Sequence, residues 1–482
     1  MGSITRPLSP GARRNAGLTP NASRRSLWLQ EALDGAQDQP SLEGSHSADM
    51  AIAGGGFVGL WTAIQLKQRD PDCDVVVLER DVCGGGASGR NGGFAMSWWP
   101  KLSSLINQCG TDEALRLGRA SAAAIDEIGE FCDEHAIDAE FRRGGFLWTA
   151  TTPSHVGAWE AVVSRCERLG VDAFDRTDPA DVARRTGSPI HLAGVFEAQA
   201  ATVQPALLAR GLRRVALELG VRIYENTHVV RFSRDLPLVV QAVGGSLQAK
   251  KLIIAMNAWA AALPELRRSM VIVSSEIAAT PAIPDRLEQI GWTGGECITD
   301  SQMMVAYYRT TADGRIAFGK GTAGVTFAGR VGEAFDRNDR RIKLAESDFR
   351  RYYPTLSDVP IEHHWGGPID RTPNSLPIFG HLGGREHILY GVGWSGNGVG
   401  PSVLGGKILS SLALGVEDEW STTPLVDGVQ GRFPPEPARF VGAQIVRQAV
   451  IRKERAEATG RKPRPLAVHV AKLAPAGLED KE

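Results

Sequence analysis

The stretch Asp49–Gly59, DMAIAGGGFVG, decides the fold of this chain. Its apolar residues 50–53 predict a buried strand, which leads directly into a Gly54-x-Gly56-x-x-Gly59 turn. Glycines at this spacing permit a tight turn, close approach of a pyrophosphate to the backbone, and close packing of the next helix on the strand. We expect that helix over Val58–Gln68, with its first N–H groups directed at the phosphates of a dinucleotide.

An acidic residue follows at the distance that a dinucleotide site requires. After the expected helix, the β-branched run Asp74–Leu78 predicts a second strand, and Glu79 follows it, 20 residues beyond Gly59. A carboxylate about 20 residues past the last glycine accepts hydrogen bonds from a ribose in such sites. Strand, glycine turn, helix, strand and acid therefore occur in Rossmann-like order, which makes an incidental glycine-rich loop the weaker interpretation.

The composition is that of an ordinary globular protein. Its 482 residues suffice for two or three domains, and 43% of them are hydrophobic and 23% charged. With 54 basic and 55 acidic residues the net charge is −1, so no overall field favours nucleic acid or an anionic membrane. The six cysteines form no C-x-x-C pair and no close cluster with histidines, so the sequence predicts neither a disulfide scaffold nor a metal site.

The N-terminal region and the longest apolar run bear on the location of the protein. Residues 1–48 hold no apolar stretch of signal-peptide length, and the apolar residues that follow Arg24-Arg25 end at Leu33, too early for a twin-arginine signal. The longest apolar run, residues 252–263, is too short to cross a membrane. We therefore expect a cytoplasmic protein without a membrane span, in which a flexible arm, residues 1–25, precedes a short helix over Ser26–Leu33.

The remaining pattern divides the chain into interleaved segments. A helical stripe over 203–220, short strands at 221–224, 229–232, 238–243 and 247–249, and a buried strand at 251–256 predict a return to the nucleotide-binding domain. We assign 26–95, 195–264 and 360–430 to that domain, and 96–194 and 265–359 to an inserted α+β substrate domain on a mixed or antiparallel sheet. Residues 431–482 are Pro-rich and then basic, and their apolar face favours a helical extension packed on the body over a membrane-binding helix.

A second glycine-rich segment carries more information than the first. Residues 84–93 read GGGASGRNGG, shortly after Glu79. The order GxGxxG, acid, GASGRNGG resembles the D-amino-acid-oxidase-like flavoproteins, the family that contains glycine and sarcosine oxidases and γ-glutamylputrescine oxidase. The resemblance implies that this segment wraps the FAD pyrophosphate and the edges of the flavin. Its glycines expose backbone donors, and Arg90 offers a positive fork near a dianion.

Two later segments match the same family. Residues 255–259, AMNAW, resemble the segment in which a strand end turns beside the cofactor, and residues 376–399 resemble the strand and glycine-rich helix start placed under the flavin. A helix N-terminus there supplies N–H groups and positive potential. The residues that the resemblance assigns to FAD are Gly54, Gly56, Phe57, Val58, Gly59, Glu79, Arg80, Ala87, Ser88, Arg90, Asn91, Gly92, Gly93, Val229, Asn257, Trp259, Gly393, Ser395, Gly396, Asn397, Gly398 and Val399.

Within the family the chain most resembles the aminophosphonate oxidoreductase subgroup, through segments that include Ser26–Leu29, Val273–Ser275, Tyr307–Arg309 and Phe433–Pro437. The resemblance implies an FAD-dependent amine oxidoreductase that passes a hydride from the carbon beside nitrogen to flavin N5, with hydrolysis of the imine to an aldehyde plus amine or ammonia. The implied substrate is 2-aminoethylphosphonate or its N-methyl derivative, and O₂ or another acceptor takes the electrons. The alternatives are an amino-acid or γ-glutamyl-polyamine oxidase of the same family and, more remotely, a tRNA-modifying flavoprotein.

An anionic substrate needs cationic or hydroxyl groups around it. The candidates for contact with the substrate are Tyr308, Arg309, Lys320 and Arg371, with Tyr307 as a further hydroxyl donor and Trp365 as a wall. Residues 365–400 contain no Cys, the residue through which some relatives attach the flavin, so the predicted FAD is noncovalent. Some oxidases place a lysine over flavin N5. In this sequence the matching position is Ala317, with Lys320 nearby, so the sequence does not decide whether the enzyme is an oxidase or a dehydrogenase.

Overall fold

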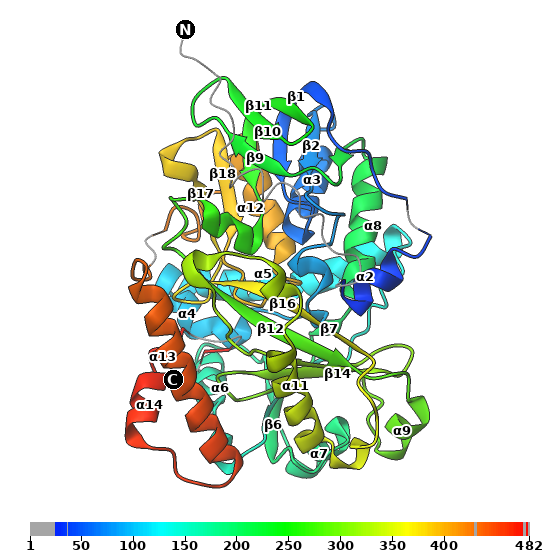
Figure 1. The fold of residues 1–482 in the computed structure, drawn as a ribbon, viewed down its shortest axis with the longest axis vertical. Helices are drawn as coiled ribbons and strands as arrows, with labels where there is room; N and C mark the ends of the chain where they lie inside the picture. Colours follow the sequence, from blue (N-terminus) through cyan, green and yellow to red (C-terminus); the bar gives the residue numbers. More distant parts are fainter. Residues whose placement is uncertain (1–24, 36, 429–430, 476–478, 481–482) are drawn as a thin grey trace.

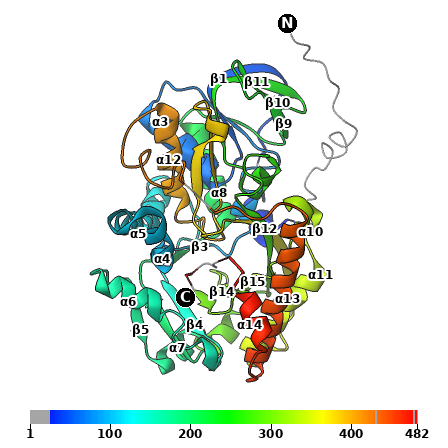
Figure 2. The same cartoon turned by 90° about the vertical axis from the view of Figure 1, so that its left-hand side faces the viewer.

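Two β-sheets organise the two halves of the molecule, one above the other in Figure 1 and in the side view of Figure 2. The computed structural model describes residues 25–35, 37–428, 431–475 and 479–480. The flexible arm expected over residues 1–25 lies outside the described residues except for Arg25. Each large sheet has eight strands, and β3 (Phe94–Ala95) and β7 (Ala201–Thr202) form a third sheet of two.

The first sheet has a parallel centre with antiparallel strands at its periphery. Its main path runs β17 (Ile378–His381), β18 (Ile388–Val392), β11 (Gly245–Ile254), β1 (Gly44–Ala53), β2 (Val75–Leu78) and β8 (Arg222–Tyr224), and β10 (Leu238–Ala242) and β9 (Val229–Phe232) extend it from β11. β18, β11, β1, β2 and β8 pair in parallel, as expected for a doubly wound nucleotide-binding sheet. The strands expected separately at 247–249 and 251–256 are one strand, because β11 stays paired with β1 from Gly245 to Ile254.

Helices cover this sheet through their apolar faces. They are α3 (Phe57–Arg69), α8 (Pro205–Glu218) and α12 (Ser402–Leu414), with α4 (Leu102–Cys109) and α5 (Thr111–Glu134) alongside. Leu208, Leu212 and Val215 of the expected stripe on α8 are buried. The short N-terminal helix α2 (Leu27–Ala32) packs beside α8 (Figure 1).

The second sheet is antiparallel except at one pair. Its strands lie in the order β16 (His363–Arg371), β12 (Val271–Ala279), β15 (Ile316–Lys320), β14 (Ala306–Thr310), β13 (Cys297–Asp300), β4 (Phe146–Ala150), β6 (Ala193–Glu197) and β5 (Asp175–Thr177), and only β13 and β4 run parallel. Its helices are α6 (Glu160–Arg168), α7 (Pro179–Thr186), α9 (Pro284–Gln289), α10 (Glu333–Asp336) and α11 (Asp339–Tyr352). The predicted α/β fold, a parallel nucleotide-binding sheet with a largely antiparallel second sheet, is confirmed. β16 lies within the segment 360–430, which we assigned to the nucleotide domain, yet it pairs with β12 along its whole length.

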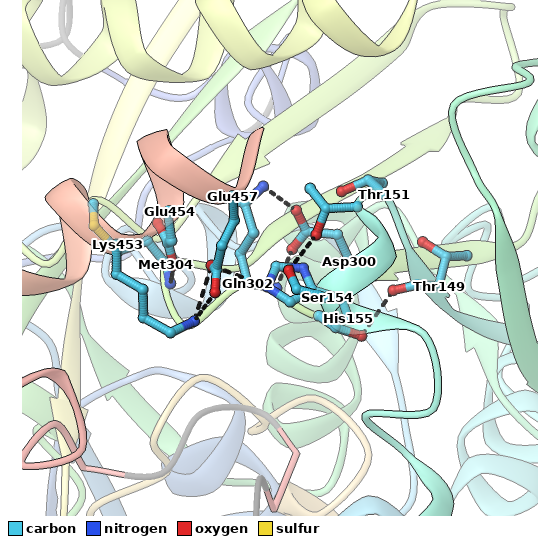
Figure 3. A network of polar contacts seen from close by, with 12 residues as sticks. Thr149, Thr151, Ser154, His155, Asp300, Gln302, Met304, Lys453, Glu454 and Glu457 are labelled. Carbon is cyan, nitrogen blue, oxygen red and sulfur yellow. Dashed lines mark hydrogen bonds and ion pairs between the residues drawn. The ribbon is translucent and has the colours of Figure 1, made fainter. Parts of the chain in front are cut away.

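The C-terminal helices α13 (Ala438–Ala458) and α14 (Pro465–Ala471) pack on the second half, where Val450 and Ala471 form a small apolar cluster with Met304. Polar side chains of α13 make further contacts there (Figure 3). Glu454 Oε1 accepts a hydrogen bond from the Met304 N–H at 2.8 Å, and Glu457 lies 3.4 Å from His155 Nε2. Lys453 Nζ lies 2.7 Å from the same Glu457 carboxylate. In the part of the chain that the structure describes, no helix combines the length and apolar character that a bilayer crossing needs, and no three His, Cys, Asp or Glu side chains are grouped to hold a metal ion.

A buried carboxyl group in the second sheet predicts a pH-dependent stability. Burial raises the pKa of Glu197 to about 7, and the nearby Ser97 side chain offsets only part of that effect. A carboxyl whose pKa is raised by folding stabilises the fold fully at low pH, and this contribution is lost as the pH rises through 7. Replacing Glu197→Gln removes the ionisation. The difference in unfolding free energy between the variant and wild type should therefore shift in favour of the variant by about 2–3 kcal/mol from pH 5 to pH 8. Urea unfolding at both pH values tests this, with the exposed Glu417→Gln as a control that gains nothing; an equal difference at the two pH values would contradict it.

Candidate active site

A cavity of about 1420 Å³ is bordered by both large sheets. Ala53, Leu78 and Ala255, at or just past the carboxyl ends of β1, β2 and β11, line one part of it. Tyr307 of β14 and Arg371 of β16 line another part. Ligands of doubly wound sheets bind at the carboxyl ends of the strands. Because small-molecule pockets typically measure about 300–1,000 Å³, this volume has room for a dinucleotide and a substrate together.

Most residues that the sequence assigned to a cofactor converge on this cavity. Those that line it are Gly54, Gly56, Phe57, Val58, Glu79, Arg80, Ala87, Ser88, Arg90, Asn91, Gly92, Val229, Asn257, Trp259, Gly396, Asn397, Gly398 and Val399. The four others, Gly59, Gly93, Gly393 and Ser395, are not among the lining residues. They shape the backbone behind the wall of the cavity instead.

The glycine turn needs glycine at its first and last positions for steric reasons. Gly54 has φ +115°, a conformation that side chains rarely adopt, and its N–H donates to the Leu78 carbonyl at 2.9 Å. A Cβ at Gly59 would collide with the carbonyl oxygen of Gly54. Helix α3 can therefore begin directly against the strand, and its first N–H, of Phe57, donates to Ser88 Oγ at 2.9 Å beside the cavity.

Glu79 lies at the cavity wall as a preorganised acceptor. Its Oε2 accepts from the Gly55 N–H at 2.7 Å and its Oε1 from the Asp81 N–H at 2.9 Å. Burial raises the pKa of Glu79 to about 7. The Glu79 carboxylate, the backbone at Gly56 and the start of α3 all line the cavity and match the acceptor and donors that the ribose and pyrophosphate of FAD require, so these residues fit the cofactor that the resemblance implies.

The GASGRNGG segment is internally braced. The Asn91 amide donates to the Ala87 carbonyl at 3.1 Å and the Ser88 carbonyl at 2.8 Å, and its oxygen accepts from the Gly93 N–H at 2.7 Å. Arg90, expected to face a dianion, also pairs with Asp336 of α10 at 2.5 Å and donates to the Gly85 carbonyl at 3.0 Å. The segment is thus a fixed loop at the cavity wall, tied to α10 by an ion pair.

The glycine-rich turn at 393–399 departs from its expected form. The sequence placed a helix start at Ser395–Val399, but α12 begins only at Ser402, because Gly393, Ser395 and Gly396 have positive φ values that no α-helix accommodates. Asp370 holds the turn: its carboxylate accepts from the N–H groups of Gly393 at 2.6 Å and Trp394 at 3.1 Å. Burial raises the pKa of Asp370 to about 7.

Sequence reasoning missed Asp370 and singled out its neighbour, Arg371. Asp370 also accepts from the Asn257 side chain at 3.1 Å, so one carboxylate joins two segments that line the cavity. The available signal was an acid beside a candidate ligand at the end of a strand that leads toward the glycine-rich turn.

Two of the residues considered for substrate contact line the cavity. Arg371 is half-buried, and desolvation of its guanidinium lowers its pKa to about 10, an effect that the carboxylate of Glu479 partly offsets. Tyr307 lies on β14, and its hydroxyl is 2.7 Å from Ser275 Oγ, which lines the same cavity. The cavity lining therefore holds a cation and a pair of hydrogen-bonded hydroxyl groups, which the register of β12 and β16 separates by four residues along the strands.

The other candidates lie elsewhere. Tyr308 points to the opposite face of β14 from Tyr307, where it stacks on Phe318 with ring centroids 4.9 Å apart. Lys320 Nζ is 2.7 Å from Asp348 and donates to Gln302 at 3.0 Å. Neither Lys320 nor Ala317 is among the residues that line the cavity.

Arg309 and Trp365 lie behind the GASGRNGG segment. Arg309 Nε donates to the Gly92 carbonyl at 2.8 Å, and Trp365 Nε1 donates to the Arg90 carbonyl at 2.9 Å. Neither residue lines the cavity. The structure thus puts both against the loop, on the side away from a substrate.

Comparisons with known proteins agree with this geometry. A family model described as FAD dependent oxidoreductase, DAO, matches residues 49–412. Gamma-glutamylputrescine oxidoreductase of Escherichia coli is 29% identical over 378 residues, which cover 78% of this chain and 85% of that protein. A Haemophilus influenzae protein named Probable oxidoreductase OrdL is 28% identical over 432 residues, 87% of this chain and 96% of the relative. Among solved structures, glycine oxidase from Geobacillus kaustophilus shares the fold with a TM-score of 0.62 and 20% identity, covering 77% of this chain and 96% of the other. The chain therefore belongs to the DAO family of FAD-dependent oxidoreductases, and FAD is its cofactor.

Proposed function

We propose that this enzyme oxidises the C–N bond of a small amine that also carries an anionic group. The observation that carries the proposal is Arg371, a half-buried cation among the residues that line the cofactor cavity, which the Tyr307 and Ser275 hydroxyls also line. A guanidinium in a water-poor site binds carboxylate or phosphonate oxygens strongly and in a fixed orientation. An amine fastened at its anionic end has its nitrogen-bearing carbon held in one place.

An amino acid or a γ-glutamyl amine is the substrate class that we favour. Relatives that cover most of the chain include a gamma-glutamylputrescine oxidoreductase and a glycine oxidase, and both names describe oxidation of amines that carry a carboxylate. 2-Aminoethylphosphonate and its N-methyl derivative form the second candidate class. This class is supported by the segments that resemble the aminophosphonate oxidoreductase subgroup. One of them, Val273–Ser275, contributes Ser275 to the cavity wall.

The residues of the chain act on binding and orientation. When bound, FAD supplies the hydride acceptor for the carbon beside nitrogen, and the imine is hydrolysed to an aldehyde or oxo acid. Arg371 binds the anionic group, and the Tyr307 hydroxyl, hydrogen-bonded with Ser275, offers a polar contact at another position of the cavity lining. Gly54, Gly56, Glu79 and the GASGRNGG segment would hold the nucleotide. None of the six cysteines lines the cavity, which supports noncovalent attachment.

Anaerobic mixing with a panel of amines tests the proposal. The panel contains glycine, sarcosine, γ-glutamylputrescine, 2-aminoethylphosphonate and N-methyl-2-aminoethylphosphonate, and bleaching of the flavin absorbance band reports the transfer of electrons. We expect the carboxylate-bearing amines to bleach the flavin fastest. Faster bleaching by the two phosphonates would move the assignment to the second class, and bleaching by none of the five would contradict an anionic amine substrate. Admitting air afterwards shows whether O₂ serves as the electron acceptor.

A further inference from the structure

Four consecutive main-chain carbonyls in the GASGRNGG segment each accept a hydrogen bond from a different side chain. Ser26 Oγ donates to the Gly89 carbonyl at 2.5 Å, and Trp28 Nε1 donates to the Asn91 carbonyl at 3.0 Å. Trp365 Nε1 donates to the Arg90 carbonyl at 2.9 Å, and Arg309 Nε to the Gly92 carbonyl at 2.8 Å. Ser26, Trp28, Arg309 and Trp365, here called the carbonyl clamp, come from the start of α2, from β14 and from β16. Three separate parts of the chain therefore meet on one side of one loop.

The carbonyl clamp is buried and held in place by its own contacts. Its four side chains are between 0% and 2% exposed. The Trp28 and Trp365 rings meet edge to face with centroids 5.5 Å apart, and the Arg309 guanidinium lies 5.1 Å from the Trp28 ring. Ser26 Oγ also accepts from the Leu29 N–H at 3.1 Å and so caps α2. Arg309 also donates to the Val203 carbonyl at 2.7 Å. The donors are thus rigidly positioned before any cofactor binds.

The clamp turns the loop carbonyls away from the cofactor. Arg90, Asn91 and Gly92 line the cavity, whereas none of the four clamp residues does. The carbonyl oxygens therefore point to the side opposite the cavity, and the loop presents its other edge there. A carbonyl oxygen carries partial negative charge, and in a cavity with little water it would repel a pyrophosphate or a reduced flavin.

We propose that the carbonyl clamp is a second layer of the FAD site, and that the segment Ser26–Trp28 belongs to the cofactor machinery. The clamp residues act through the loop and are positioning residues. By fixing four carbonyl dipoles outward, they raise the affinity for FAD and favour the uptake of electrons by the bound cofactor. This role goes beyond the proposed substrate and is independent of it, because it concerns only the cofactor that the family establishes.

A single-donor deletion tests the proposal. Trp28→Phe removes the Nε1–H donor and keeps an aromatic ring beside Arg309. Trp292→Phe is the matched control: Trp292 is also fully buried, but its Nε1 has no hydrogen-bond partner among the described residues. We expect Trp28→Phe to raise the Kd of the apoprotein for FAD about tenfold, because the released Asn91 carbonyl can turn toward the cavity, where it would repel the pyrophosphate. The midpoint potential of the bound flavin should also become more negative, while Trp292→Phe changes neither quantity.

The results separate a clamp from general packing. If Trp28→Phe leaves both the FAD Kd and the midpoint potential at wild-type values, the proposal is overturned. Equal effects of Trp28→Phe and Trp292→Phe would also overturn it, since loss of any buried indole would then suffice. Where Trp28→Phe fails to fold, Trp365→Phe removes the donor to the neighbouring Arg90 carbonyl, and the same two measurements decide. Activity toward amines enters neither measurement, so a wrong substrate assignment leaves the test intact.

Discussion

Replacing Arg371→Met is expected to lower kcat/KM for the anionic amine by about two orders of magnitude or more while FAD stays bound. Arg371 is half-buried in the cavity lining, so a substrate anion that enters the variant loses part of its water and meets no cation at this position. Removal of one partner from a desolvated charge pair costs about 2–5 kcal/mol. Steady-state kinetics with the best substrate of the panel, together with the flavin absorbance of the purified variant, measure both halves of this expectation.

Arg371→Lys is the matched control because it keeps the charge and loses the planar fork. It should retain more activity than Arg371→Met, yet less than wild type, since a single ammonium cannot bind an anion in the two-pronged geometry of a guanidinium. A neutral amine of the same size should be oxidised equally by wild type and Arg371→Met. Equal losses for the anionic and the neutral amine would show that Arg371 supports the structure of the cavity and does not bind the substrate.

Replacing Gly59→Ala is expected to reduce the affinity for FAD by at least tenfold. The new Cβ would overlap the Gly54 carbonyl oxygen, a main-chain atom that cannot move without displacing the glycine turn. Helix α3 must then withdraw from β1, which moves the start of the helix away from the position where phosphate is expected. Overpacking of this kind costs about 1–3 kcal/mol. Fluorescence titration of the apoprotein with FAD measures the loss.

Gly442→Ala provides the control for this substitution. Gly442 lies in α13, and a Cβ there would meet no atom within 4 Å. The same chemical change should leave FAD binding unchanged and make the apoprotein slightly more stable, because alanine favours a helix over glycine by about 1 kcal/mol. If Gly59→Ala bound FAD as tightly as Gly442→Ala, the close contact between α3 and the strand would not be required for the cofactor.

The nucleotide half could be predicted from the sequence because its signals are local. The glycine spacing, the β-branched run before Glu79 and the stripe on α8 each act over a few residues, and β1, α3, β2 and α8 form where these patterns indicate. The boundary of the last glycine-rich turn could not be read in this way. Helix α12 starts at Ser402 rather than near Ser395 because the positive φ values of the turn are imposed by Asp370, a residue of the other sheet.

The side chains that line the substrate part of the cavity could not be predicted from the local sequence, because they depend on how the two sheets pack. Alternation along β14 shows that Tyr307 and Tyr308 face opposite sides, but only the packing of the two sheets decides which side is the cavity. Arg309 shares a face of β14 with Tyr307, and its guanidinium is nevertheless directed to the Gly92 and Val203 carbonyls. A long cationic side chain can serve a distant backbone group as readily as a ligand, and the sequence cannot distinguish the two.

One measurement tests the central claim, that this cavity holds FAD and presents Arg371 to an anionic amine. The purified protein, saturated with FAD, is mixed anaerobically with an amino acid and, separately, with the amide in which its carboxylate is neutral, while the flavin absorbance is followed. We predict rapid bleaching with the amino acid and slow bleaching with the amide in wild type, and slow bleaching with both in Arg371→Met. A protein that takes up no FAD, or that is bleached equally fast by both amines, would contradict the account.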